Sequence, residues 1–378
     1  VNKQGLIETV GSGIPRIDFS DDANGALLLE PTSTNIVDNS VNFFLNGWSG
    51  TRALEGSTIV SPNGNNEAHK LVATSVSNTH YREFTVISAS ANTYTGSCFF
   101  KKGEFNVGAI RMSVDSNANR IGVYINLDNG THLQTSTVGS PTGTSYKIED
   151  YGNGWYRLSV SIIHTSGEVR MSLSNAPSDY TNSNGLPVFL GNSSDGGYSW
   201  GAQLEEGSYA TSYIKTVGTT QTRVADTASD AGNSTVINST EGVLYAEISA
   251  LDDDLTFRQI SLRSSDTANS LIIGYRNSTN KIYSQLFSSG VSQSFISFDV
   301  PNITEINKVA VLYGSNKVEL WINGIKRASS GLATNPIGLS ELNFYGATSG
   351  SPFYGKTKDL RVYTTALSDA ELTTLTTI

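Results

Sequence analysis

Residues 309–329 read VAVLYGSNKVELWINGIKRAS, in which apolar and polar residues alternate on both sides of a short turn. A period of two residues predicts strands with one buried face and one solvent-facing face. The first turn falls at Gly314–Asn316, and Asn323–Gly324 provides a second turn of the kind that favours tight β-hairpins. This stretch therefore predicts antiparallel strands in a sheet that covers a core.

The same pattern extends over most of the chain. Short alternating segments fill residues 41–214, among them AHKLVATSV, GAIRMSVDS, IGVYINLD and WYRLSVSII, and a second series runs from VLYAEISAL to KDLRVYTT. Turn residues follow each segment, and helical periodicity is absent until Ser368 and Glu371 of LSDAELTTL, which fit a capping box. We predict an all-β protein with two antiparallel β-sandwich (jelly-roll) domains in tandem and one short C-terminal helix.

The composition shifts suggest where these domains begin and end. We expect a lead-in or interface segment at residues 1–40, a first sandwich at 41–214, a polar Ser/Thr-rich connector at 215–240 and a second sandwich at 241–378. The chain begins with Val1 rather than Met, which suggests that it is the distal part of a longer polypeptide.

Charge and cysteine content exclude several classes of function. The formal net charge is −9 and the sequence has no Lys/Arg-rich run, so nucleic acid and anionic membrane surfaces are poor partners. Cys98 is the only cysteine, which excludes an internal disulfide framework and a thiolate zinc cluster. No apolar stretch is long enough to span a bilayer, so we expect no membrane insertion.

Several motifs resemble a known group of proteins. The strings ALLLEPTSTNIV, YGNGWYRLSVSI, WGAQLEEGSYATSYI and TRVADTAS, in this order, resemble the tail-fibre, spike and surface proteins of bacteriophages and prophages, in which a carbohydrate-binding-module-like sandwich precedes a further domain. KVELWINGIKRAS and FYGKTKDLRVYTTALSDAEL resemble a laminin-G-like or concanavalin-like jelly roll. Together the two resemblances cover nearly the whole chain.

The resemblance implies a virion-surface, extracellular location and a homotrimer that contacts other virion proteins and a host cell-surface polysaccharide or glycoprotein. We therefore expect a non-catalytic glycan-binding, lectin-like protein that serves receptor binding and host attachment. One alternative is a purely structural appendage protein that mediates chain–chain contacts. Another is an accessory fragment of a polysaccharide depolymerase whose catalytic part precedes Val1.

The sequence carries no motif of an enzyme. Residues 193–200, SSDGGYSW, match the Asp-box of sialidase propellers once, without a repeated blade period, and Asp195 followed by two glycines is suited to a tight turn. The four histidines have no metal-ligand spacing, and neither a Gly-x-Ser-x-Gly elbow nor a phosphate loop is present. We predict no catalysis and no cofactor, and a turn into the last strand of the first sandwich at SSDGGYSW.

Sugar binding in proteins uses exposed aromatic faces flanked by amides and charged groups. In the first sandwich, Tyr124 and Asn126 share strand parity, and six residues lie on strands or strand ends where they could line one open face. Tyr275, Tyr283, Tyr313 and Trp321 of the second sandwich are comparable, whereas Trp48, Trp155 and Trp200 are expected in the core. The candidates are Tyr81, Arg82, Arg111, Arg120, Tyr124, Asn126, Tyr275, Tyr283 and Trp321.

Structural calcium is the one metal to consider, because many carbohydrate-binding sandwiches hold it through carboxylates and carbonyls. Here the last strand of the first sandwich carries no carboxylate before Glu205, which weakens that expectation. If calcium binds, the candidate ligands are Asp195, Glu205, Asp252, Asp253 and Asp254. The favoured interpretation of these acids is ordinary surface charge.

Overall fold

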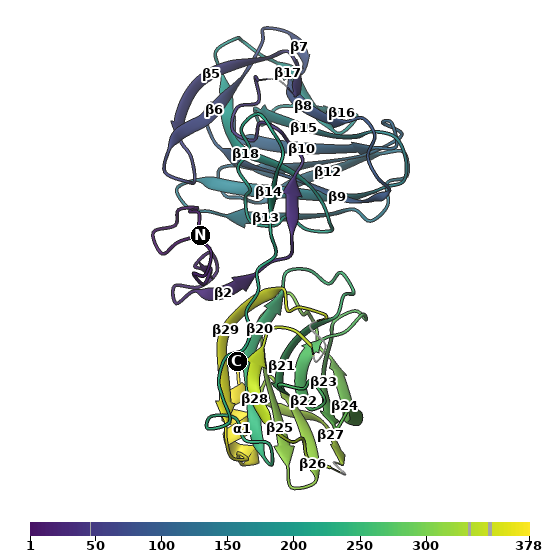
Figure 1. Cartoon of the computed structure of the whole chain (residues 1–378). Coiled ribbons are helices and arrows are strands. Elements are labelled where there is room, and N and C mark those ends of the chain that lie inside the picture. The colour runs from purple at the N-terminus through teal and green to yellow at the C-terminus, as the bar shows by residue number, and fades with distance from the viewer. Residues whose placement is uncertain (46, 332–333, 347–349) are drawn as a thin grey trace. The chain divides into compact units, whose positions relative to one another are not determined.

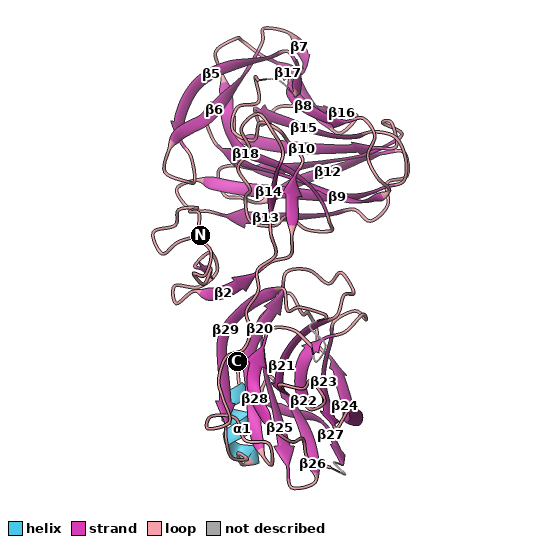
Figure 2. Ribbon diagram, in the orientation of Figure 1, coloured by secondary structure: helices cyan, strands magenta, loops and turns pink. Residues whose placement is uncertain are grey.

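Strands make up almost all of the regular structure (Figure 2), and the all-β prediction is confirmed. The structure is a computed structural model that describes residues 1–45, 47–331, 334–346 and 350–378. The chain divides into two compact units, here called unit 1 (Val1–Thr9 and Thr32–Val224) and unit 2 (Val10–Pro31 and Ala225–Ile378) (Figure 1). In the part of the chain described, no helix has the length and apolarity to cross a bilayer.

Unit 1 is built around two six-stranded antiparallel sheets. Sheet I has the order β12-β11-β10-β15-β8-β4, sheet II has the order β13-β14-β9-β18-β6-β5, and two small sheets join β16-β17-β7 and β19-β3. The strands are β3 (Ser33–Asn35), β4 (Trp48–Thr51), β5 (Ala53–Val60), β6 (Asn66–Ala73), β7 (Ser77–Thr79), β8 (Tyr81–Val86), β9 (Asn92–Lys101), β10 (Val107–Val114), β11 (Asn119–Asn126), β12 (His132–Val138), β13 (Ser145–Asp150), β14 (Trp155–His164), β15 (Val169–Ala176), β16 (Thr181–Ser183), β17 (Leu186–Leu190), β18 (Gly196–Glu206) and β19 (Gln221–Arg223).

The core of unit 1 lies between sheets I and II. Alternate residues of β10, such as Ile110 and Met112, are fully buried in one hydrophobic cluster with Leu158 and Val160 of β14. Their strand neighbours point to the opposite face, because side chains alternate along a strand. Whether the outer face of each sheet is buried or exposed therefore depends on which other segments pack against it.

The outer face of sheet II is covered by aromatic residues from the predicted motifs. Trp200 is fully buried with Phe99 and Trp155, and the ring of Tyr213 lies 4.4 Å from that of Trp200. SSDGGYSW enters β18 through a turn in which the side-chain oxygen of Asn192 accepts bonds from the next amides, so its expected role as a turn is confirmed.

Buried polar side chains then tie the ends of unit 1 to sheet II. The Glu205 carboxylate is 1% exposed and accepts hydrogen bonds from the Ser33 hydroxyl, the Gln203 amide and both the hydroxyl and the backbone N–H of Thr211. Glu205 is therefore fully used as an acceptor of protein donors.

Part of the outer face of sheet I is covered by the β16–β17 hairpin. A Cβ atom on Gly122 of β11 would lie 2.1 Å from the carbonyl oxygen of Gly185, so the hairpin turn rests directly on that glycine. Beside it, Tyr124 and Phe189 share a small hydrophobic cluster with Phe105. The rest of this face carries charged residues.

Unit 2 is a second sandwich. Sheet III has the order β1-β2-β29-β20-β25-β26-β27 and sheet IV has the order β24-β23-β22-β21-β28, all antiparallel pairs. The elements are β1 (Ile17–Asp18), β2 (Ala26–Leu29), β20 (Gly242–Ala250), β21 (Arg258–Ser264), β22 (Ser270–Tyr275), β23 (Lys281–Ser288), β24 (Val291–Asp299), β25 (Asn307–Gly314), β26 (Lys317–Ile322), β27 (Ile325–Gly331), β28 (Leu339–Asn343), β29 (Gly355–Tyr363) and the helix α1 (Asp369–Thr376).

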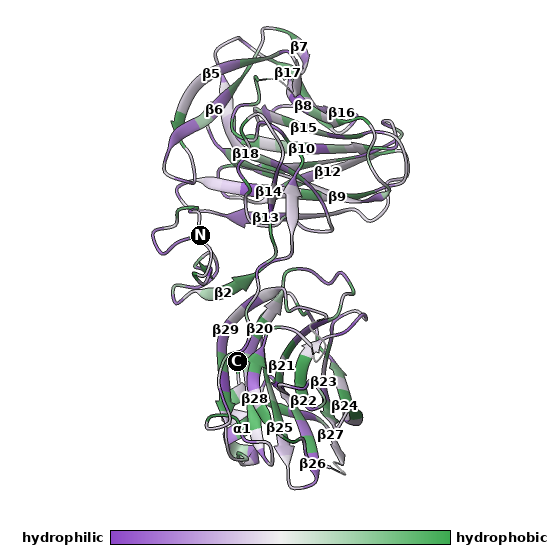
Figure 3. Ribbon diagram, in the orientation of Figure 1, coloured by the Kyte–Doolittle hydropathy of each residue, from purple (hydrophilic) through white to green (hydrophobic). Residues whose placement is uncertain are grey.

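The stretch 309–329 folds as its pattern predicts. Gly314 pairs with Lys317 and Ile322 pairs with Ile325, so each turn has two residues, and Asn323 and Gly324 both have positive φ. Valines and leucines of β25 and β26 fill the core between sheets III and IV. Figure 3 shows hydrophilic and hydrophobic segments along the same strands, as expected for strands with one buried face.

The C-terminal helix forms as predicted, with Ser368 as its N-cap and a complete capping box with Glu371. Its Leu372 is fully buried against the outer face of sheet III, in a cluster with Leu312 and Trp321. Helix α1 therefore closes a face that the strands alone would leave open.

Residues 1–40, expected as a lead-in or interface segment, are shared between the units. Residues 10–31 belong to unit 2, because β2 pairs with β29 in sheet III. The expected connector at 215–240 contains β19, which pairs with β3 in unit 1, and the division of the chain falls between Val224 and Ala225.

Candidate functional site

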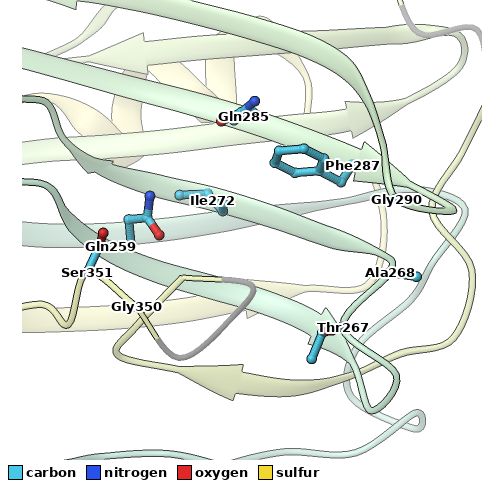
Figure 4. Close-up of a pocket in the computed structure, with 9 residues that line it drawn as sticks. All are labelled: Gln259, Thr267, Ala268, Ile272, Gln285, Phe287, Gly290, Gly350 and Ser351. Atoms are coloured by element: carbon cyan, nitrogen blue, oxygen red, sulfur yellow. The ribbon is translucent and has the colours of Figure 1, made fainter.

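A groove of 360 Å³ lies on the outer face of sheet IV in unit 2 (Figure 4). Three neighbouring strands and the turns at their ends form it. Its lining residues are Gln259, Thr267, Ala268, Ile272, Gln285, Phe287, Gly290, Gly350 and Ser351.

Strand pairing explains why these side chains meet. Ile272 of β22 pairs with Gln285 of β23, and Phe287 stands two residues further along the same face. The intervening residues, such as Ile273 and Leu286, point into the core of unit 2. The groove therefore combines an apolar floor with amide groups on either side of it (Figure 4).

The amide nitrogens of the two glutamines are bonded to described residues. The amide nitrogen of Gln285 donates to the hydroxyl of Ser292 at 3.1 Å, and that of Gln259 donates to the hydroxyl of Tyr283. Among the residues that the structure describes, no donor reaches the side-chain oxygen of Gln259 or Gln285. The oxygen of Gln285 is thus available to a hydroxyl that enters the groove, whereas the oxygen of Gln259 packs against Gly346.

Next to the groove, Tyr283 is 1% exposed because Phe257 and Phe295 pack around its ring, with centroids 6.2 and 5.7 Å away. Phe295 is itself 44% exposed, and the guanidinium of Arg276 lies 4.8 Å from the centre of its ring. Tyr283 was expected at a sugar site and lies beside the groove, where it supports Gln259 rather than presenting its own ring.

The other two aromatic candidates of unit 2 are buried elsewhere. Tyr275 is fully buried in the core between sheets III and IV, and burial raises the pKa of its phenol well above the usual range. Trp321 is 4% exposed under helix α1, where its indole N–H donates to Glu319. Neither ring can receive a ligand from solvent, since the hydrophobic face of a strand is the one that packs.

In unit 1, strand parity brings some of the predicted residues together on the outer face of sheet I. Arg120 of β11 and Arg170 of β15 flank Ser113 of β10, with which both pair. Arg111 lies two residues along β10 from Ser113, and its guanidinium lies 5.4 Å from the ring centre of Tyr81. We call Arg111, Ser113, Arg120 and Arg170 the arginine face.

Arg82 was expected on the same open face, and this was wrong. It follows Tyr81 on β8 and therefore points to the other side of the sheet. Its guanidinium donates to the backbone carbonyls of Phe43 and Trp48, at 2.7 and 3.3 Å. Arg82 thus holds a loop in place instead of facing solvent.

Tyr124 and Asn126 point to the outer side of sheet I as their parity predicted. Tyr124 is fully buried, however, because the ring of Tyr180 stacks on it at 5.2 Å and the Asn182 amide donates to its hydroxyl. Asn126, Tyr180 and Asn182 line a second groove, of 440 Å³, together with Leu133. Tyr124 supports the floor of that groove and does not form its surface.

Two of the five candidate calcium ligands lie in unit 1 and three lie in unit 2. Glu205 is surrounded by protein donors, and the carboxylate of Asp254 accepts from Thr256 and forms an ion pair with Arg258. Asp253 accepts from the backbone N–H of Asn280. The remaining candidates are Asp195 in unit 1 and Asp252 in unit 2. Within the described ranges, no group of three or more His, Cys, Asp or Glu side chains could hold a metal ion.

Sequence reasoning missed the residues that line the groove of unit 2. Gln259, Ile272, Gln285 and Phe287 all lie in segments that were recognised as strands, and their parity opposite to the core residues could have identified the face. The sequence does not indicate which face of these strands packs in the core and which is the outer face. The aromatic candidates Tyr124, Tyr275 and Trp321 pack in hydrophobic clusters.

A family model described as "Concanavalin A-like lectin/glucanases superfamily" matches residues 220–373, which are mostly residues of unit 2. The carbohydrate-binding β-sandwich expected from the resemblance agrees with this family description. No curated protein sequence matches the chain.

Solved structures with some similarity include the Ruminococcus gnavus IT-sialidase CBM40, at 15% identity and a TM-score of 0.33, over 40% of this chain and 95% of that one. A heptameric SAP-like pentraxin from Limulus polyphemus has 12% identity and a TM-score of 0.32, over 39% and 73% of the two chains. The Caenorhabditis elegans galectin LEC-6 has 14% identity and a TM-score of 0.27, over 36% and 89%. Similarity at this level does not transfer a ligand to the chain.

Proposed function

We propose that the protein binds carbohydrate without catalysis, and that the groove on the outer face of sheet IV is a sugar-binding site. The observation that carries this proposal is the amide oxygen of Gln285, which no described donor reaches, beside the apolar residues Ile272 and Phe287. The match of residues 220–373 to a lectin and glucanase family supports the same class of ligand.

The chemistry of the groove suits a sugar. A pyranose ring offers C–H groups to the Phe287 ring and a hydroxyl donor to the amide oxygen of Gln285. A groove of 360 Å³ accommodates one or two sugar units, in the range of small-molecule sites. No carboxylate lines the groove among the described residues, so the paired acids that glycoside hydrolysis requires are not found there.

The biological setting follows from the motif resemblance. We propose that the chain belongs to a phage tail fibre or spike and attaches to a host cell-surface polysaccharide or glycoprotein, with other virion proteins as its neighbours. Trimerisation would present three weak sites to a repetitive glycan, and linked sites raise the overall avidity by about 10² to 10⁴. The two alternatives are a structural appendage protein and an accessory part of a depolymerase.

The test is binding of the full-length chain to a glycan array and to host-type polysaccharides, followed by titration of the best ligand. Phe287→Ala and Gln285→Ala should each weaken binding by about tenfold, since a ring contact and a hydrogen bond each contribute on the order of 1 kcal/mol. Ile325→Ala, which removes an exposed apolar side chain of β27, is the matched control and should leave the affinity unchanged.

Wild-type affinity in both groove variants would refute this site. An absence of glycan binding by intact oligomers would favour a structural protein. Release of reducing ends from a polysaccharide would refute the non-catalytic assignment.

A further inference from the structure

The arginine face of unit 1 gathers more positive than negative charge. Arg111, Arg120 and Arg170 contribute three positive charges, and the acids paired with them are Glu83 and Glu168. The chain as a whole is acidic, with a net charge of −9. The arginine face therefore has one positive charge in excess, on a protein that is acidic as a whole.

Two of the three arginines are held in place by protein groups. Arg111 donates to Glu83 at 2.9 Å and to the hydroxyl of Ser172 at 3.0 Å. Arg170 is bonded to Glu168 and also donates to the other oxygen of Glu83, at 3.3 Å. These contacts fix two guanidinium groups on the face before any ligand arrives.

Arg120 differs from its neighbours. Among the described residues it has no hydrogen-bond or ion-pair partner, and its Nε atom is buried. Burial, the charge of Arg111 and the charge of Arg170 lower its pKa, and only Glu83 acts in the opposite direction. An unpaired guanidinium held next to two like charges is unfavourable, unless an anion binds there.

A second observation points to the same place. Ser113, between Arg120 and Arg170, is fully buried, and its hydroxyl has no partner among the described protein groups. A buried hydroxyl without a partner is costly, so a ligand atom above it would be stabilising.

The surroundings define the shape of the site. The turn of the β16–β17 hairpin forms one border, where the carbonyl of Asn184 lies 3.5 Å from a guanidinium nitrogen of Arg111. Hydroxyl side chains of Thr85, Ser136 and Ser172 stand on the same face of the sheet. Hydroxyl groups around a cationic centre suit a ligand that carries both an oxyanion and hydroxyls.

We propose that the arginine face of unit 1 binds the oxyanion of an acidic sugar, a carboxylate or a sulfate, with Arg120 as the residue that receives it. Guanidinium groups pair with such anions through two parallel hydrogen bonds, a geometry that neutral sugars cannot reproduce. This site lies in unit 1 and does not depend on the groove in unit 2.

The experiment uses the whole chain of residues 1–378 and three probes. Glucuronic acid and glucose differ in one carboxylate, and sodium sulfate tests whether the inorganic oxyanion alone competes. Ligand-observed NMR titration should show that glucuronic acid binds, that glucose does not bind at the same concentration and that sulfate displaces glucuronic acid.

The decisive variant is Arg120→Gln, which should weaken glucuronic acid binding by at least about tenfold, since a hydrogen bond to a charged group contributes that much or more. Because Arg120 has no protein partner among the described residues, the thermal midpoint should stay equal or rise, as expected when like charges are relieved. Lys147→Gln, a matched charge removal at an exposed position of β13, should change neither quantity.

Three results would overturn the proposal. These are equal binding of glucose and glucuronic acid, unchanged affinity in Arg120→Gln, and an absence of binding by both glucuronic acid and sulfate. Binding of sulfate alone would reject the sugar as the ligand. A Phe287→Ala variant should keep full affinity for glucuronic acid, which separates failure at this site from failure at the groove of unit 2.

Discussion

Replacement of Glu205 by alanine should destabilise unit 1 strongly. The carboxylate receives four hydrogen bonds, of which those from Gln203 and from the backbone N–H of Thr211 measure 2.6 and 3.0 Å, and the Ser33 hydroxyl bridges to a distant part of the chain. Alanine would leave these donors buried without an acceptor. It would also remove a negative charge that acts on Arg157, which is 2% exposed.

The size of the effect follows from these contacts. Loss of one partner from a buried, hydrogen-bonded charge network costs about 3 to 5 kcal/mol, less than the sum of four separate bonds because the donors rearrange. For a unit of this size, about 2 to 4 °C per kcal/mol gives a fall of roughly 6 to 20 °C in the thermal midpoint. Such a loss is a large share of the stability of an ordinary domain.

Urea unfolding followed by tryptophan fluorescence measures the free energy of unfolding of unit 1, because three of the four tryptophans lie in that unit. Asp179→Ala, which removes an exposed carboxylate from the same unit, is the control and should change the free energy of unfolding by less than about 0.5 kcal/mol. A cost below about 1 kcal/mol for Glu205→Ala would refute the assignment of Glu205 as the central acceptor. A rise of the wild-type midpoint with added calcium that Glu205→Ala abolishes would instead identify Glu205 as a calcium ligand.

Two further predictions concern titration and reactivity. Burial favours the neutral form of Asp115, but hydrogen bonds from Thr165, Asn119 and Ser166 outweigh it and lower the pKa of the carboxyl to about 2, so its contribution to stability is present above pH 4 and is lost as the pH falls through about 2. Asp115→Asn should therefore be less stable than the wild type at pH 7, with a difference that shrinks between pH 4 and 2 in chemical denaturation; a difference that does not change with pH would contradict this. Cys98 is fully buried and burial raises the pKa of its thiol, so a thiol reagent should modify it only after unfolding, and rapid labelling of the native protein would speak against this packing.

Local patterns in the sequence determined the elements of the fold. The alternation in 309–329 predicted β25 and β26, and the Asn-Gly pair predicted the turn that follows, because period and turn chemistry are properties of neighbouring residues. Ser368 and Glu371 specified the start of helix α1 for the same reason. The motif tryptophans were expected in the core, and all three in unit 1 are buried.

Tertiary structure decided which residues reach solvent. Tyr124 has the parity of an exposed residue, yet Tyr180 and Asn182, more than 50 positions away, cover it. The C-terminal helix α1 packs over Trp321 and excludes solvent from its ring. No local pattern reports such coverage, because it depends on where a distant segment packs.

The candidate sites show the same division. Parity alone puts Arg111, Arg120 and Arg170 on one face once β10, β11 and β15 are known to be neighbours, but their order in sheet I is set by long-range pairing. That pairing leaves Arg120 without a protein partner among the described residues, and the pairing of sheet IV leaves the Gln285 oxygen without a described donor. The sequence by itself determined strands, turns and helix through local periodicity. The assembled sheets decided which side chains are open, since each face is covered or exposed by segments far away in the chain.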